Sequence, residues 1–268
     1  MRYSMVVSDW DDTLVPLGET IPERTRAALD RIRADGVVMA IASGRGSEGL
    51  RVQLRRNAID LDGLYLLGFN GALAIQAWDD EVLFSHQLSN ELAARAARVC
   101  MEAGAAVMTH SGSRVFTDQP DHFAVRFEAD SNEYERVHVS DFESLDFVPA
   151  KLLIGGENEL LTPLSRRLQE EFADEAEVML SAGFLMEFTA KNVNKGNALR
   201  GLCEAIGVPV SEVVAFGDNF NDVPMMEVAG YSVAVADGVP ELLQIVDRVT
   251  APSRESGVAD VLDELFPA

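Results

Sequence analysis

Four short segments of the sequence place acids, hydroxyls or amides directly after apolar runs. They are Asp9-Trp10-Asp11-Asp12-Thr13, Ser43-Gly44-Arg45, Asn70-Gly71 and Gly217-Asp218-Asn219-Phe220-Asn221-Asp222. A lysine, Lys195, opens a further helix-like segment. Crowded carboxylates repel one another and call for a divalent cation, and Mg²⁺ prefers oxygen ligands, commonly one or two carboxylates together with a substrate phosphate. Gathered at one place, these residues indicate phosphoryl transfer.

Each residue type suits one part of that chemistry. A carboxylate held in line with phosphorus attacks it and forms an acyl phosphate. A second carboxyl two residues along, as Asp11 is from Asp9, can protonate the leaving oxygen and then activate water. Lys195, Ser43 and backbone amides would hold the phosphoryl oxygens as charge spreads over them.

The elements around these segments predict how they meet. Apolar runs at 5–8, 37–42 and 64–67 read as buried strands, and 21–35 and 50–58 have helical periodicity. This alternation indicates an α/β fold with a Rossmann-like parallel sheet. The same rhythm returns after Asn194, with a helix over 195–206 and a strand over 213–216. Ligands of such sheets bind at the carboxyl ends of the strands, where the polar segments stand.

The middle of the chain follows a different pattern. It begins after a hairpin around Asp79-Asp80 and contains helices over 92–103 and 159–172, with strand-like pieces near Val107, near Val115 and over 123–127. Further strands are predicted over 151–154, 178–180 and 185–188. We therefore expect a discontinuous core of residues 1–84 and 188–268, and an inserted α+β lid, or cap, of residues 85–187.

Composition excludes several partners. The 268 residues carry 44 acids and 22 bases, a net charge of −22, which argues against nucleic acid and against anionic membranes. No stretch has the length of a transmembrane helix, and the two cysteines, Cys100 and Cys203, make no disulfide framework. We expect a cytoplasmic protein, a monomer or a weak homodimer, that acts on a small phosphorylated metabolite.

In their order along the chain and their placement at strand ends, these motifs resemble those of the haloacid dehalogenase superfamily. Within it, the sequence resembles the Cof-type sugar phosphatases with a type IIB lid. The resemblance covers nearly the whole chain. It implies a phosphoric monoester hydrolase with Asp9 as nucleophile, Asp11 as general acid/base and Lys195 as third catalytic residue. The implied metal ligands for Mg²⁺ are Asp9, Asp11, Asp218 and Asp222. The implied substrate or phosphate contacts are Ser43, Gly44, Arg45, Asn70, Asn221 and Lys195.

One residue departs from the family pattern, because Asp12 stands where glycine is usual. Aspartate tolerates positive φ better than most residues, so we expect Asp12 to keep the turn and to point outward. Two alternatives to a phosphatase stay open: a phosphomutase of the same fold, and a non-catalytic protein that binds phosphorylated metabolites. For substrate selection the loop 118–122 and the turn 181–184 are the candidates in the lid.

Overall fold

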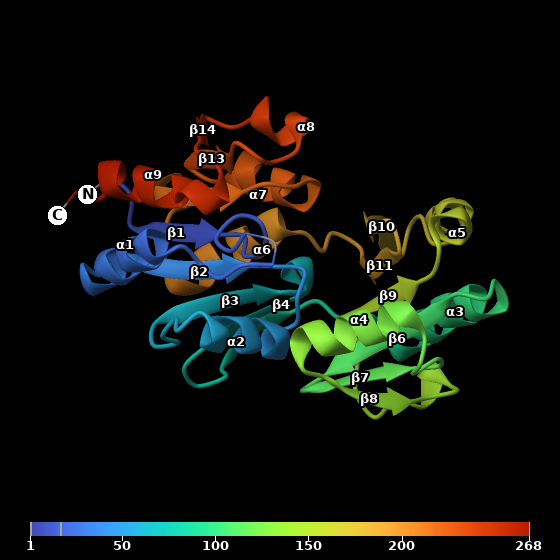
Figure 1. The fold of residues 1–268 in the computed structure, drawn as a ribbon. Coiled ribbons are helices and arrows are strands. Elements are labelled where there is room, and N and C mark those ends of the chain that lie inside the picture. Colours follow the sequence, from blue (N-terminus) through green and yellow to red (C-terminus); the bar gives the residue numbers. More distant parts are fainter. Residues whose placement is uncertain (1, 17, 268) are drawn as a thin grey trace. The chain divides into compact units, whose positions relative to one another are not determined.

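The computed structural model describes residues 2–16 and 18–267, and the chain divides into two compact units (Figure 1). The first unit comprises Met1–Arg45, Gln53–Phe84 and Asn194–Ala268, and the second comprises Gly46–Val52 and Ser85–Val193. The predicted lid boundary at 187/188 falls inside a continuous strand of the second unit, Leu185–Ala190. The second unit also takes in a segment that the sequence did not associate with the lid, Gly46–Val52.

The first unit is built on one sheet with the strand order β14-β13-β12-β1-β2-β3-β4-β5. Its strands are β1 (Met5–Ser8), β2 (Val38–Ala42), β3 (Leu64–Gly68), β4 (Leu73–Gln76), β5 (Val82–Ser85), β12 (Val213–Gly217), β13 (Tyr231–Val235) and β14 (Arg248–Thr250). From β14 to β3 neighbouring strands are parallel, and β4 pairs antiparallel with β3. The predicted parallel α/β core is confirmed, and β1 lies between β2 and β12, so their carboxyl ends are neighbours.

Helices follow the parallel strands, as the alternating pattern predicts. They are α1 (Glu23–Ala34), α2 (Ser47–Arg56), α6 (Lys195–Ile206), α7 (Val223–Val228), α8 (Pro240–Leu243) and α9 (Gly257–Leu265). The buried face of α6, with Ala198, Leu199 and Leu202, packs in one apolar cluster with the strand residues Val7 and Ala215. Each fully buried leucine of this kind contributes about 1.5–3 kcal/mol. This packing holds the start of α6 against the sheet.

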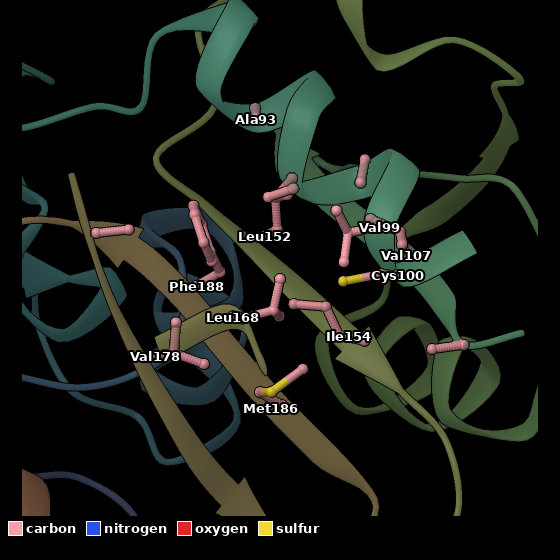
Figure 2. Close-up of a cluster of buried hydrophobic side chains, with 14 of the residues drawn as sticks. Ala93, Val99, Cys100, Val107, Leu152, Ile154, Leu168, Val178, Met186 and Phe188 are labelled. Carbon is pink, nitrogen blue, oxygen red and sulfur yellow. The ribbon is translucent and has the colours of Figure 1, made fainter. Parts of the chain in front are cut away.

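The second unit has its own sheet, in the order β10-β11-β9-β6-β7-β8. The strands are β6 (Ala106–Ser111), β7 (Arg114–Thr117), β8 (Glu135–His138), β9 (Lys151–Gly155), β10 (Ala176–Ala182) and β11 (Leu185–Ala190), and the helices are α3 (Asn90–Glu102), α4 (Phe123–Asn132) and α5 (Asn158–Glu171). Side chains of α3, α5 and one face of the sheet form a continuous apolar core (Figure 2). A second apolar cluster, which includes Met108 and Leu153, packs α4 against the other face.

One predicted element of this unit is wrong. Residues 123–127 were expected to form a strand and instead begin helix α4, while the strand β8 was not anticipated. The His122 side chain accepts a hydrogen bond from the Ala124 N–H and so caps the helix. The buried positions Ala124, Val125 and Ala129 follow helical spacing. Five residues were too short a window to separate the two periods.

No helix in the described part of the chain has both the length and the apolar character needed to span a membrane.

Candidate active site

The nucleophile candidate and one metal-ligand candidate lie at neighbouring strand ends. Asp9 directly follows β1, and Asp218 directly follows β12. The two strands are parallel and in register, with Ser8 opposite Phe216, and the Asp9 N–H donates to the Phe216 carbonyl at 2.9 Å. Both carboxylates are therefore carried to the same edge of the sheet.

Lys195 reaches this edge from the first residue of α6. The Asn194 side chain caps the helix by accepting from the Asn197 N–H. The Lys195 Nζ donates to Asp9 Oδ1 at 2.5 Å and to Asp222 Oδ1 at 2.7 Å, and its side chain is fully buried. Burial by itself lowers the pKa of this amine, but the Asp222 and Asp9 carboxylates outweigh it and raise the pKa above its ordinary value. Lys195 is thus a permanently charged cation among carboxylates.

Asp222 organises the loop after β12. Its second oxygen, Oδ2, accepts from the backbone N–H of Asp218 at 2.9 Å and of Asn219 at 3.1 Å. A Cβ on Gly217 would lie 2.6 Å from the Asp222 carboxyl carbon, so only glycine allows this approach. The Asp222 carboxylate thus takes part in a capping box with Asn219 and also accepts a hydrogen bond from Lys195.

Three carboxylates gather here. One oxygen from each of Asp9, Asp218 and Asp222 lies within 4.8 Å of the others. Burial, followed by the carboxylate of Asp222, raises the pKa of Asp218 to about 7, although the Thr13 hydroxyl donates to Asp218 Oδ1 at 2.7 Å and lowers it. Burial also raises the pKa of Asp9 well above its usual range, against the lowering effect of Lys195. One lysine does not neutralise this cluster, and an all-oxygen donor set of this kind fits a hard divalent cation.

Asp11 lies apart from the buried cluster. Its side chain is 49% exposed, and both of its oxygens accept from the Arg45 guanidinium, from Nε at 2.8 Å and from Nη2 at 2.7 Å. The structure therefore does not bring the Asp11 side chain into the cluster of carboxylates that Asp9, Asp218 and Asp222 form. It does place Arg45, an implied substrate contact, directly on the acid/base candidate Asp11.

The remaining predicted contacts surround the same edge. Ser43 is buried after β2; its hydroxyl accepts from the Arg45 N–H at 3.1 Å, with Gly44 in the bend between them. The Asn70 N–H donates to the Ser43 carbonyl at 2.9 Å, and the Asn221 amide donates to Asn70 Oδ1 at 3.1 Å. These contacts bring the second polar segment, Asn70 and Asn221 into one network.

The turn at Asp12 has the conformation expected of it. Asp12 has φ +62°, in the left-handed region that glycine adopts freely, and its N–H donates to the Val15 carbonyl at 2.8 Å. The prediction that this position needs a turn conformation is confirmed. Its half-buried side chain lies with Asp11 and Arg45 in the lining of a pocket of about 260 Å³.

Sequence reasoning did not single out Thr13 as a site residue. Its hydroxyl joins the segment after β1 to the segment after β12 through Asp218. The available signal was its place in the first polar segment, two residues beyond Asp11. No local pattern indicated that Thr13 would pair with Asp218, 205 residues away along the chain.

Comparisons with known proteins identify the family of the chain. Residues 6–262 match the model of the haloacid dehalogenase-like hydrolase family. A Haemophilus influenzae protein with the provisional name phosphatase is 31% identical, covering 100% of both chains. The HMP-PP phosphatase of Cronobacter sakazakii is 28% identical over 88% of this chain and 85% of its own. A solved haloacid dehalogenase-like hydrolase from Bacteroides thetaiotaomicron superposes with a TM-score of 0.91 at 27% identity, covering 98% of this chain and all of that one. The chain belongs to the haloacid dehalogenase-like hydrolases, in their Cof-type branch, and is a phosphatase.

Proposed function

We propose that this phosphatase hydrolyses small phosphomonoesters, such as sugar phosphates, in a Mg²⁺-dependent reaction that passes through an aspartyl-phosphate on Asp9. The observation that carries the proposal is the buried contact of Asp9 with Lys195, beside Asp218 and Asp222. A carboxylate so placed has a cation next to it that can hold phosphoryl oxygens. It also has two further acids that fit a metal ion.

Each step of the reaction would use residues of this chain, as follows. An Asp9 carboxylate oxygen forms a bond to phosphorus while the bond from phosphorus to the ester oxygen breaks, and Asp11 gives a proton to that leaving oxygen. Asp11 then takes a proton from water as the water oxygen bonds to phosphorus and the Asp9–phosphorus bond breaks. Inorganic phosphate leaves and both acids are restored. Lys195 and Ser43 stabilise the charge on the phosphoryl oxygens.

The donor set also supports the cofactor. Asp9, Asp218 and Asp222 would hold Mg²⁺, with Asp11 as the fourth acid close by in sequence. The bound ion would neutralise carboxylates that otherwise repel one another, and it would supply positive charge for the phosphoryl group.

The setting of the enzyme is part of the same proposal. We place it in the cytoplasm as a monomer or weak homodimer, with residues 85–187 as the predicted lid. Burial raises the pKa of the Cys100 thiol to about 12 and that of Cys203 to about 11, so both stay protonated and act as apolar core groups.

The test is hydrolysis of p-nitrophenyl phosphate in Mg²⁺ by the Asp9→Asn variant. We expect turnover to be lost, because an amide oxygen cannot serve as the nucleophile. Asp35→Asn, at an exposed side chain that follows helix α1, is the matched control and should keep wild-type turnover. Turnover by Asp9→Asn would refute the role of Asp9. Isomerisation of a hexose phosphate with little phosphate release would instead identify a phosphomutase.

A further inference from the structure

Each of the two acids that the proposed reaction uses is held by a cation. Asp9 is bound by Lys195, and Asp11 is bound by Arg45. The pairs differ in exposure: the Lys195 and Asp9 side chains are 0% and 8% exposed, whereas those of Arg45 and Asp11 are 22% and 49% exposed. All four residues belong to the first unit. The outer pair also lines the pocket of about 260 Å³, so the Asp11 carboxylate is open to a leaving group or to water.

The contact between Arg45 and Asp11 fixes the orientation of the carboxylate. The Arg45 Nε donates to Asp11 Oδ2 at 2.8 Å and Nη2 donates to Oδ1 at 2.7 Å, so one guanidinium holds both oxygens. The backbone around Asp11 is fixed as well, because Asp11 pairs with Val15 and the Asp12 N–H donates to the Val15 carbonyl at 2.8 Å. The side-chain torsions of Asp11 are the freedom that remains, and the guanidinium fork restricts them.

The backbone of Arg45 is itself held on both sides. Its N–H donates to the Ser43 hydroxyl at 3.1 Å, and its carbonyl accepts from the Phe69 N–H at 2.8 Å. Phe69 has φ +54°, a left-handed conformation that is unfavourable for a bulky side chain. Strain of this kind persists where the surrounding contacts impose it, and it gathers at functional sites. These contacts set the point from which the Arg45 side chain reaches Asp11.

We infer that Arg45 is the positioning residue of Asp11: its guanidinium fork holds the acid/base carboxylate in the orientation that serves the leaving oxygen and then water. An ion pair as exposed as this one adds little to stability, so orientation is what the fork supplies. A catalytic acid or base is commonly oriented by a third group in this way. The inference rests on the proposed function. It differs from the implied role of Arg45 as a substrate contact, because Arg45 acts here through Asp11.

The test uses p-nitrophenyl phosphate in Mg²⁺, because this substrate separates the two steps that involve Asp11. Nitrophenolate is a stable anion that leaves phosphorus without a proton, so its release does not need Asp11 as an acid. Release of inorganic phosphate does need Asp11, which takes a proton from the attacking water. With enzyme in excess over substrate, nitrophenolate release measures the first step and phosphate release measures both steps.

The variant Arg45→Met removes the fork and keeps an unbranched side chain. We expect phosphate release to slow by about 10- to 100-fold, because a misplaced catalytic group loses much of its effect. Nitrophenolate release, and the enzyme concentration that half-saturates it, should stay within about twofold, since Arg45 does not act on the substrate. Arg45→Lys should slow phosphate release similarly, because an ammonium does not hold both carboxylate oxygens in a fork.

The double variant Asp11→Asn/Arg45→Met decides between a positioning residue and a substrate contact. Asp11→Asn alone should slow phosphate release by about 10²–10⁴-fold. Adding Arg45→Met should slow it by no more than about a further twofold, because Arg45 then has no carboxylate to position.

The matched control is Arg248→Met, at a side chain that is 27% exposed and lies on β14, the edge strand of the same sheet. It removes an ion pair with an Arg248 Nη1 to Glu264 Oε2 distance of 2.7 Å, and it should change neither rate. Thermal unfolding followed by circular dichroism reports the folding of every variant.

Three results would overturn the inference alone. They are losses that multiply in the double variant, nitrophenolate release that slows as much as phosphate release in Arg45→Met, and phosphate release that Arg45→Met leaves unchanged. If Arg45→Met does not fold, an unchanged phosphate release in Arg45→Lys overturns the inference in the same way. Undiminished phosphate release by Asp11→Asn would instead refute the acid/base role of Asp11 in the proposed function.

Discussion

Replacing Lys195 with methionine tests the electrostatic account of the site most directly. The substitution keeps an unbranched side chain of similar length and removes the positive charge of Nζ, which contacts both Asp9 and Asp222. Both carboxylates stay buried, and each loses its hydrogen bond to Nζ. The structure therefore predicts a loss of stability as well as a loss of activity.

The expected size of that loss follows from the contacts. Removing one partner of a buried ion pair costs about 3–5 kcal/mol. Asp222 keeps its two backbone N–H donors, and Asp9, whose pKa burial already raises, can take up a proton in place of the lost cation. Both effects limit the cost. We therefore expect the free energy of unfolding to fall by about 3 kcal/mol at pH 8 and by clearly less at pH 5, where the Asp9 carboxyl is protonated more easily. Turnover should fall by about 10²–10³.

Tryptophan fluorescence in urea with EDTA is a suitable assay. Both tryptophans of the chain, Trp10 and Trp78, belong to the first unit, so their signal reports the unit that contains the site. A loss of about 3 kcal/mol should lower the urea midpoint by about 1 M if the denaturant slope is about 3 kcal/mol/M. Phosphate release from p-nitrophenyl phosphate measures the activity.

The double variant Lys195→Met/Asp222→Asn separates charge from shape. Removing the second charge should recover about 1–2 kcal/mol of the lost stability, because an interacting pair is non-additive, but it should not recover turnover. An unchanged midpoint in Lys195→Met at pH 8, or no recovery in the double variant, would refute the view that Lys195 holds together carboxylates that otherwise repel.

Three further predictions concern the residues around this pair. In EDTA, the free energy of unfolding of the wild type relative to Asp218→Asn should fall as pH rises from about 4 to about 7, by up to about 1.4 kcal/mol per pH unit. The reason is that the pKa of Asp218 in the folded state, about 7, lies above its unfolded value, so the folded state favours the bound proton. Urea midpoints at several pH values measure this difference, and a difference that rises with pH would contradict the prediction. Thr13→Val removes the hydroxyl that donates to Asp218 and should lower the free energy of unfolding by about 1.5–3 kcal/mol. Thr20→Val, at an exposed threonine, is the control in the same midpoint assay, and equal midpoints for the two variants would count against a stabilising hydrogen bond. Asp12→Gly should retain turnover of p-nitrophenyl phosphate, since glycine adopts φ +62° without strain, and a loss of turnover would show that the Asp12 side chain itself is required.

The local features of the site could be predicted because short-range patterns specify them. An apolar run that ends in polar residues marks a strand end, which located Asp9, Ser43 and Asp218 correctly in the fold. Helix starts such as that of α6 carry a capping residue, Asn194, just before the first helical position. Where the window was short, as at 123–127, the same reasoning failed, because burial of α4 against the sheet decided its conformation.

The sequence by itself determined which chemistry is present: a carboxylate nucleophile candidate, its acid/base neighbour, a lysine and further acids, each next to a predicted strand or helix end. Only the tertiary structure decided which of them touch. Lys195 meets Asp9 across 186 residues, Asp11 turns to Arg45 and away from the buried acids, and Lys151 meets Glu187 across neighbouring strands. Residue type and local period are properties of a short segment. Contacts between distant segments depend instead on strand register and on the packing of the whole core, which no local pattern encodes.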